Sequence, residues 1–396
     1  MFKKKFDNIN FLVGGKIERV LTSPYDLEVC KFLESLSKEL EKKIYNKYAD
    51  LKSLSFWCRK KNLEKLKSSF ISEKLKKGKG LIFHITPSNV PTNFVYSLIF
   101  GLLTGNSNII KVPSKKFDQV SIICNLINKI LKIKRFKKVK KLINIIRYEK
   151  ENDEFTKFLS SICDVRIIWG GSKTIKAIRK FPLQERSSEL TFADRYSLCL
   201  LDSKKIEKLN EFDLKLLVKR FYNDTYLFDQ NACSSPHLIL WMGNSSSFSR
   251  QRFWKTLSLY LEEKYNLPEK ASYDKYNKLC NDVVNLKNFK SQEKFGNLIY
   301  TLLLNKLDED VDKMRGKWGY FYEYKINNLN QIKKIINNKF QTLTYFGVEK
   351  KLLQTFVKNN LRGIDRVVPI GQALDISLNW DGIDINNALT RVIDIK

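Results

Sequence analysis

The hydrophobic pattern of the chain changes near residue 78. Before this point, apolar residues recur every three or four positions between residues 27 and 44 with lysines between them, which predicts helices with one solvated face. After it, two short continuous apolar runs, at 81–85 and 108–112, enclose an apolar helical pattern at 92–103. Two such runs joined by a helix predict a βαβ unit with buried parallel strands and a right-handed crossover.

The alternation of strands and helices continues along the chain, and a second α/β unit begins near residue 229. Further strands are predicted at 141–146, 165–169, 197–201, 237–241, 298–304, 320–326 and 342–346. Further helices are predicted at 117–131, 153–162, from 172, and at 205–221, 250–265 and 269–286. This order favours an α/β fold whose first part is a doubly wound sheet.

The charge balance favours anionic partners. Lys and Arg number 72 against 42 Asp and Glu, so the formal net charge is +30. This excess fits nucleic acid, phosphorylated small molecules or an acidic carrier protein, and it equally fits the Lys-, Asn- and Ile-rich composition of an AT-rich genome. The lysines are spread along the chain and no zinc finger, RRM signature or basic zipper is present, so we expect no nucleic-acid partner.

The cysteines and the apolar segments indicate a cytoplasmic protein. The seven Cys are widely spaced and include no C-x-x-C pair, which argues against a disulfide framework and a structural metal site and favours a reducing compartment. The longest strongly apolar stretch, 94–103, is shorter than the roughly 20 residues that span a bilayer. The N-terminal MFKKKF lacks the apolar core of a signal peptide. We expect no metal and no membrane span.

Two segments after predicted strands could carry chemistry. In ITPSNVP (85–91), two prolines hold Asn89, whose amide could stabilise an oxyanion or could cap the helix that follows. The strand at 108–112 contains Lys111 and is followed by Ser114 and Lys115. These lysines could meet phosphate or ribose groups, although lysines at a strand end are also common on surfaces.

Two later segments have similar potential. Gly170, Gly171 and Ser172 follow a strand and open a helix, where glycines allow close approach of a ligand and the helix N-terminus favours anions. A simple turn explains them equally well, since G-x-G-x-x-G is absent. In DQNACSSPH (229–237), Cys233 lies among small polar residues, so it is either an accessible nucleophile or a small buried apolar residue. His237 could be a base, but it begins an apolar run, and a core or surface histidine is the favoured interpretation.

The four segments occur together and in order, and in this the sequence resembles the long-chain acyl-CoA reductases of the LuxC type, within the aldehyde dehydrogenase superfamily. The resemblance runs from about residue 75 to the C-terminus. It rests on HITPSNVPTNFVYSLIFGLLTGNSNIIKVPSK (84–115), WGGSKTI (169–175), FADRYS (192–197), DQNACSSPHLI (229–239) and RVVPIGQALDISLNWDGIDI (366–385). The first block and DQNACSSP are specific, whereas WGGS is not.

The resemblance implies an aldehyde-dehydrogenase-like fold, with a doubly wound Rossmann-type cofactor domain and a second α/β catalytic domain. We expect the N-terminal helical segment and the dinucleotide-binding domain to occupy 1–199 and the catalytic thiol domain to occupy 200–371. The C-terminal segment, 372–396, is expected to pack back on the cofactor domain or on a subunit interface. We also expect a homo-oligomer.

Roles for single residues follow from the same resemblance. Cys233 matches the catalytic thiol, and Asn89 matches the residue that holds the thioester or thiohemiacetal oxygen. Lys115 stands where NAD-preferring members place a Glu against the ribose hydroxyls, and a cation there favours the 2′-phosphate of NADPH. The remaining matches are to residues that contact the cofactor's adenosine end (Lys111 and Ser114) or its pyrophosphate (Gly170, Gly171 and Ser172).

One departure bears on the reaction. Hydrolytic aldehyde dehydrogenases carry a Glu in an E-L-G-G motif that activates water, whereas Thr191 aligns there in this chain and Glu189 lies two residues away. Without that base, a hydride or a thiol must complete the reaction. The resemblance thus implies NADPH-dependent reduction of a long-chain fatty acyl thioester to the aldehyde through a cysteine acyl-enzyme.

The substrate implied is an acyl-CoA or acyl-protein thioester, with an acyl-protein synthetase or acyl carrier protein as partner. Two alternatives from other classes stay open. One is a redox-silent acyltransferase that passes the acyl group from Cys233 to an amine or hydroxyl. The other is a nucleic-acid-binding protein driven by the positive charge.

Overall fold

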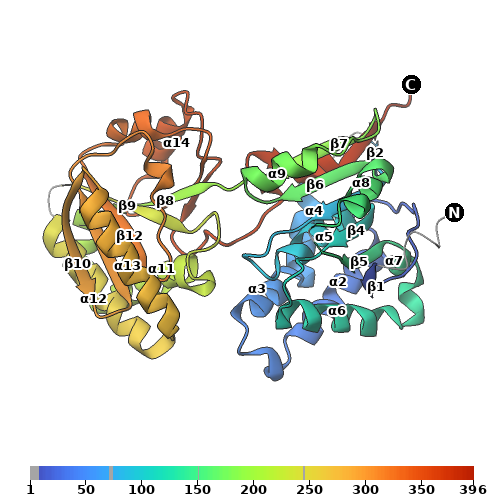
Figure 1. Ribbon diagram of the computed structural model, residues 1–396, viewed down its shortest axis with the longest axis horizontal. Helices are drawn as coiled ribbons and strands as arrows, with labels where there is room; N and C mark the ends of the chain where they lie inside the picture. Colours follow the sequence, from blue (N-terminus) through green and yellow to red (C-terminus); the bar gives the residue numbers. More distant parts are fainter. Residues whose placement is uncertain (1–8, 71–74, 150, 244–245) are drawn as a thin grey trace. The chain divides into compact units, whose positions relative to one another are not determined.

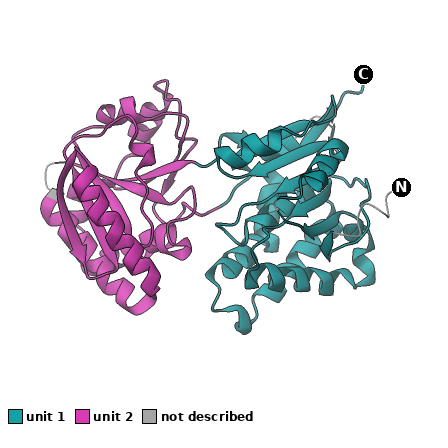
Figure 2. Ribbon diagram, viewed as in Figure 1, with its two compact units in different colours: residues 1–194, 376–396 teal, residues 195–375 magenta. Residues whose placement is uncertain are grey.

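The computed structural model describes residues 9–70, 75–149, 151–243 and 246–396. The chain divides into two compact units (Figure 2). Unit 1 comprises residues 1–194 and 376–396, and unit 2 comprises residues 195–375. Among the described residues, no helix has both the length and the apolar character needed to cross a membrane.

Unit 1 is built on a six-stranded sheet in the order β1-β5-β4-β3-β6-β7 (Figure 1). The chain adds β4 and β5 on one side of β3 and then β6 and β7 on the other, with all five strands parallel. The strands are β1 (Asn10–Val13), β3 (Leu81–Ile85), β4 (Ser107–Lys111), β5 (Ile143–Arg147), β6 (Val165–Trp169) and β7 (Ser188–Phe192). This order confirms the predicted doubly wound sheet, and its direction reverses between β3 and β6.

Both faces of this sheet are covered, because its strands are apolar at successive positions. Ile82 of β3 packs in a core with α2 (Leu27–Leu40), α5 (Asn93–Leu103) and α6 (Asp118–Leu131). Its neighbours Leu81 and Phe83 point to the other face. There they pack in a second core against α8 (Asp153–Ile162) and α9 (Ser172–Arg179).

The C-terminal segment joins unit 1. Strand β17 (Thr390–Ile393) pairs antiparallel with β2 (Leu75–Gly78), and the Trp57 indole, on α3 (Ala49–Trp57), donates a hydrogen bond to the Ile376 carbonyl at 2.7 Å. The short elements that complete the unit are α4 (Lys60–Ser69), α7 (Lys137–Lys141), β15 (Asn379–Trp380), β16 (Ile383–Asp384) and α15 (Ile385–Leu389).

Unit 2 is built on a seven-stranded sheet in the order β10-β11-β12-β9-β8-β13-β14, in which only the pairing of β10 with β11 is antiparallel among the described residues. One face packs against α13 and α14 and the other against α11 and α12. The strands are β8 (Tyr196–Asp202), β9 (Pro236–Met242), β10 (Phe289–Phe295), β11 (Ile299–Leu304), β12 (Tyr320–Ile326), β13 (Phe340–Phe346) and β14 (Arg366–Pro369). The helices are α10 (Ser203–Glu207), α11 (Glu211–Thr225), α12 (Ser246–Lys264), α13 (Glu269–Asn285) and α14 (Lys350–Lys358).

The helix predicted at 205–221 is two helices, α10 and α11. Their separation has a local cause, because each has its own N-cap. The Asp202 carboxylate accepts a hydrogen bond from the Lys205 backbone N–H, and the Asn210 side chain accepts one from Asp213. The prediction of one continuous helix was therefore wrong. The prediction followed the spacing of the apolar residues and overlooked Asn210 as the N-cap of a second helix.

Candidate active site

The loop after β3 is tied to the neighbouring strand. Both the backbone N–H and the hydroxyl of Thr86 donate to the Lys111 carbonyl, at 3.2 and 2.8 Å. Asn89 lies exposed in this loop, and the helix α5 that follows has Thr92 at its N-cap position. The structure therefore places Asn89 three residues before the N-cap position of α5.

A buried polar network lies at the base of this edge of the sheet. His84 of β3 contacts the Ser97 hydroxyl through Nδ1 at 2.7 Å and the Asn108 amide oxygen through Nε2 at 3.0 Å. Trp169 Nε1 also donates to the Ser97 oxygen, at 2.9 Å. Burial lowers the pKa of His84 to about 3, so it is neutral, with its proton on Nε2 facing the amide oxygen. The network joins α5 to β3, β4 and β6.

The region after β4 is organised around Tyr148. The Ser114 hydroxyl donates to the Tyr148 carbonyl at 3.2 Å, and the Lys111 Nζ lies 5.0 Å from the centre of the tyrosine ring. Lys115 is exposed, with its Nζ 5.1 Å from the centre of the Phe117 ring. Two cations and a hydroxyl therefore follow one another at the carboxyl end of β4.

The turn after β6 has room for a ligand. The Gly170 N–H donates to the Phe192 carbonyl at 3.1 Å, and Gly171 is the N-cap of α9 without a side-chain cap. Gly171 has a φ of −67°, so its backbone does not require glycine. A Cβ built there meets no atom within 4 Å. The surface beside Ser172 and the α9 N-terminus is therefore open, as the approach of an anionic group requires.

These segments share one edge of the unit 1 sheet. Adjacent parallel strands β4, β3 and β6 bring the Lys111–Lys115 segment, the Asn89 loop and the 170–172 turn to their common carboxyl ends. The Asn89 loop follows β3 and the 170–172 turn follows β6, and the strand order reverses between these two strands. Ligands of open α/β sheets usually bind in the crevice at this point. The sequence-predicted residues of unit 1 therefore come together on one side of the unit.

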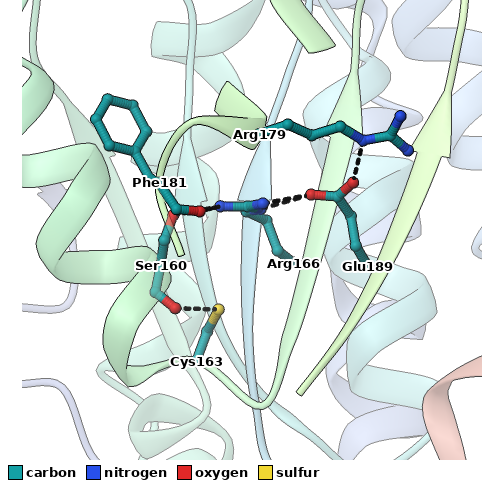
Figure 3. A network of polar contacts seen from close by, with 6 residues as sticks. All are labelled: Ser160, Cys163, Arg166, Arg179, Phe181 and Glu189. Carbon is teal, nitrogen blue, oxygen red and sulfur yellow. Dashed lines mark hydrogen bonds and ion pairs between the residues drawn. The ribbon is translucent and has the colours of Figure 1, made fainter. Parts of the chain in front are cut away.

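Glu189 is engaged in an ion-pair network on β7 (Figure 3). One of its carboxylate oxygens accepts from Arg179 Nε at 2.7 Å, and the other accepts from Arg166 Nε at 2.8 Å. Arg166 is buried and also donates to the Phe181 carbonyl at 2.8 Å, so the network fastens α9 and the segment after it to the sheet. Because two guanidinium groups occupy the carboxylate, Glu189 has a structural role and is unsuited to act as a base.

Cys233 lies half-buried in the loop between α11 and β9 of unit 2. Its carbonyl accepts a hydrogen bond from the Ser197 hydroxyl at 2.7 Å. The Ser235 N–H donates to the Ala232 carbonyl at 3.0 Å. In a trans peptide the C=O and N–H point in opposite directions, so the bond at Ala232 also fixes the direction of the Cys233 N–H.

Most of the other thiols are in different surroundings. Burial raises the pKa of Cys124 and Cys163 to about 12 and raises the pKa of Cys58 and Cys199 as well, which keeps these thiols protonated. Cys280 is exposed on α13. The loop position distinguishes Cys233 from this helical thiol.

Two residues that the sequence reasoning missed precede Cys233. Gln230 is buried and its side-chain amide bonds to four backbone groups, while the Asp229 carboxylate accepts from the Tyr265 hydroxyl at 2.5 Å. The signal available in the sequence was the polar pair Asp229-Gln230 at the start of DQNACSSP. Two polar residues beside a predicted nucleophile warranted a role of their own.

His237 is a core residue, as the sequence favoured. It is buried against the Tyr196 ring, with ring centres 5.5 Å apart, and burial lowers its pKa to about 3. A histidine that stays neutral throughout the physiological range and is sealed from solvent cannot reach a substrate proton. The structure therefore removes it from the possible bases.

The two buried histidines predict acid destabilisation. The unfolded chain takes up a proton at each histidine below its ordinary pKa of 6.5, whereas the folded chain does so only near pH 3. The free energy of unfolding should therefore fall as pH drops from 6.5 towards 3, by about 1.4 kcal/mol per pH unit for each histidine. In His237→Phe, chemical denaturation should show that the free energy of unfolding depends less steeply on pH, because the contribution of one histidine is lost. An unchanged slope would contradict the neutral assignment.

The chain is similar in sequence to acyl thioester reductases. The acyl-CoA reductase (LuxC) family matches over residues 19–393. A long-chain acyl-protein thioester reductase of Photorhabdus luminescens is 25% identical over 301 residues, which cover 74% of this chain and 58% of that protein. One of Photobacterium phosphoreum is 24% identical over 302 residues, covering 74% and 57%. The matches therefore span less than two thirds of these relatives.

The fold is similar to that of aldehyde dehydrogenases. Aldehyde dehydrogenase 21 of Physcomitrella patens matches with a TM-score of 0.64 at 11% identity, covering 98% of this chain and 97% of that one. An indole-3-acetaldehyde dehydrogenase solved with NAD⁺ matches with a TM-score of 0.63 at 12% identity, covering 92% and 82%. These likenesses confirm the predicted aldehyde-dehydrogenase-like fold. Together with the match along nearly the whole sequence, they lead to one conclusion: the chain belongs to the acyl-CoA reductase (LuxC) family.

Proposed function

We propose that this protein reduces a long-chain acyl thioester to the aldehyde with NADPH, through an acyl-enzyme on Cys233. The observation that carries the proposal is the Cys233 loop, where a half-buried thiol sits on a backbone fixed by hydrogen bonds from Ser197 and Ser235. The family description supports a CoA-bound acyl donor, and the names of the relatives support a protein-bound one.

In the first step, the Cys233 thiolate attacks the thioester carbonyl and forms a new carbon–sulfur bond. The tetrahedral intermediate then breaks the bond to the donor sulfur, and the released thiolate of CoA or carrier takes a proton from solvent. Negative charge develops on the carbonyl oxygen. We assign its stabilisation to the Asn89 amide and the Cys233 backbone N–H, whose direction the Ala232–Ser235 bond sets.

The carboxyl edge of the unit 1 sheet fits a dinucleotide. The open surface at Gly171 and the uncapped N-terminus of α9 suit a pyrophosphate, and the segment from Lys111 to Lys115 suits the adenosine end. When bound, the reduced nicotinamide supplies the hydride that converts the acyl group into a thiohemiacetal. Collapse of the thiohemiacetal breaks the carbon–sulfur bond, releases the aldehyde and restores the Cys233 thiolate.

Glu189 supports reduction over hydrolysis. Its carboxylate is engaged by Arg166 and Arg179, so it supplies no base that would activate water against the acyl-enzyme. We expect no fatty acid release above background when acyl thioester is supplied without a reductant.

The direct test incubates purified protein with NADPH and a series of acyl-CoAs or acyl-carrier thioesters, while absorbance loss and aldehyde formation are followed. Equal loss of NADPH and gain of aldehyde supports the proposal. Acylation of Cys233 without NADPH consumption, followed by transfer to an amine or hydroxyl, would identify an acyltransferase. Absence of both acylation and reduction with every donor would reject the proposal.

Lys115 should set the choice between NADPH and NADH. A charge-assisted contact with the 2′-phosphate contributes about 1.5–3 kcal/mol, so Lys115→Glu should raise the KM for NADPH roughly 10- to 100-fold and leave that for NADH unchanged or lower. Lys116→Glu is the matched control, because it makes the same charge change at the next exposed lysine. Equal effects of the two variants would reject the assignment.

A further inference from the structure

The Cys233 loop begins with an unusual backbone. Asp229 and Gln230 have φ angles of 52° and 58°, so two consecutive residues that carry a Cβ adopt the left-handed conformation. Asp229 and Gln230 contact the segment 318–319, where φ is also positive, at 55° for Trp318 and 83° for Gly319. Left-handed backbone is unfavourable for such residues and persists only where surrounding contacts enforce it. Those contacts must therefore be strong here.

Gln230 supplies the main contacts. Its Nε2 donates to the carbonyls of Pro236 and Tyr320, both at 3.2 Å. Its Oε1 accepts from the N–H groups of Gly319 and Tyr320, at 2.8 and 3.0 Å. The amide thus uses both donors and both acceptor positions, on a side chain that is 1% exposed.

The four bonds close the loop that contains the thiol. Pro236 begins β9 and Tyr320 begins β12, and these strands are adjacent and parallel. A side chain at the start of the loop therefore bonds to the residue just after its end, and Cys233 lies among the five residues between them. Within the loop, the Ser235 N–H closes a turn on the Ala232 carbonyl. The Gln230 side chain ties the two ends of the loop to β9 and β12, and so it helps to set where that turn lies.

A second set of contacts supports the facing segment. The Trp318 N–H donates to the Asp229 carbonyl at 3.3 Å, and the Tyr265 hydroxyl bonds the Asp229 carboxylate. The Nζ of the buried Lys275, on α13, donates to the Trp318 carbonyl at 2.9 Å. The 318–319 segment is therefore held from both sides, and the Gln230 side chain bonds both this segment and the end of the loop at Pro236.

We propose that Gln230 is a positioning residue for the Cys233 thiol: it anchors the 230–236 loop to the starts of β9 and β12 and so, together with the Ala232–Ser235 turn, sets the attack geometry of the sulfur. This rests on the proposed function in assigning Cys233 as the nucleophile. The geometric part concerns the loop alone and can be tested without catalysis.

The test compares Gln230→Ala and Gln230→Glu with Gln331→Ala. Gln230→Glu keeps the acceptor oxygen for Gly319 and Tyr320 but loses the Nε2 donor. Gln331 is the matched control, because its Oε1 also accepts from two backbone N–H groups, those of Asn327 and Asn328, in a capping box of the same unit. Thermal melting reports how much each variant destabilises the fold.

The first measurement is alkylation by iodoacetamide in the native protein, read at single cysteines by mass spectrometry. The exposed Cys280 thiol serves as an internal reference within each sample. We expect both Gln230 variants to change the Cys233 rate relative to Cys280 about fivefold or more, in either direction, and Gln331→Ala to leave the ratio unchanged. Equal ratios in folded Gln230→Ala and the parent protein would overturn the proposal.

The second measurement is steady-state reduction of an acyl-CoA. Misplacement of a nucleophile by about 1 Å costs on the order of 10²-fold, so kcat should fall about 10- to 100-fold while KM for the thioester stays within about threefold. A shifted alkylation ratio in a protein that reduces no thioester would reject the proposed function and leave the positioning role supported. Unfolding of both Gln230 variants would overturn it, because the residue would then serve global stability alone.

Discussion

Cys233→Ala is expected to abolish acyl-enzyme formation and NADPH-dependent reduction together. Without the sulfur there is no group at position 233 to form the covalent bond, and the remaining binding and oxyanion contacts cannot replace it. The loss in kcat should be at least about 10⁴-fold. The bond from the Ser197 hydroxyl goes to the Cys233 carbonyl, which alanine retains, and thermal melting reports whether the variant keeps its fold.

Two controls make this result specific. Cys280→Ala removes the exposed thiol of α13 and should retain full activity, and acyl-thioester labelling followed by intact mass should show one added acyl group in this variant. Cys233→Ser keeps the size of the side chain but offers a poorer nucleophile, so it should show no labelling on the time scale of turnover. Persistent NADPH consumption by Cys233→Ala would reject the acyl-enzyme route.

The sequence predicted the buried strands and the long helices well, for a physical reason. Strand β6 (Val165–Trp169) and helix α8 (Asp153–Ile162) were predicted with the bounds that the structure has, because continuous burial and strong amphipathicity leave a local signal. Strand β10 (Phe289–Phe295) was missed, since FKSQEKF lies at an edge of the sheet, where three of its seven residues are exposed and none is buried. Strand β7 was missed because its polar Glu189 is explained only by Arg166 on the neighbouring strand.

The residues of the candidate site show the same difference between local sequence signals and contacts that depend on the fold. Asn89, Lys111, the 170–172 turn and Cys233 could be proposed from the sequence because each lies in a short motif beside a predicted strand. Gln230 was missed because its role depends on Tyr320, a residue distant in sequence that only strand pairing brings near. Local patterns therefore suggest candidate reacting groups, whereas the contacts that hold them in place require the fold.

Asn89→Ala is expected to lower kcat about 10²- to 10³-fold while the KM for the acyl thioester changes little. The amide of Asn89 is assigned to the oxygen that becomes negatively charged, and a donor that strengthens as charge develops stabilises the transition state more than the substrate. Thr86 ties the base of the loop to β4 through bonds that the variant retains, and thermal melting reports whether it keeps its fold.

Ser88→Ala is the matched control, because it truncates the exposed neighbour in the same loop and should reduce turnover no more than about threefold. In Asn89→Ala, iodoacetamide should still alkylate Cys233 at the normal rate, since the thiol itself is untouched, while acylation by the thioester slows with kcat. This combination separates loss of an oxyanion donor from loss of the nucleophile. A kcat within about threefold of the parent protein, or an equal loss in Ser88→Ala, would remove Asn89 from the reaction.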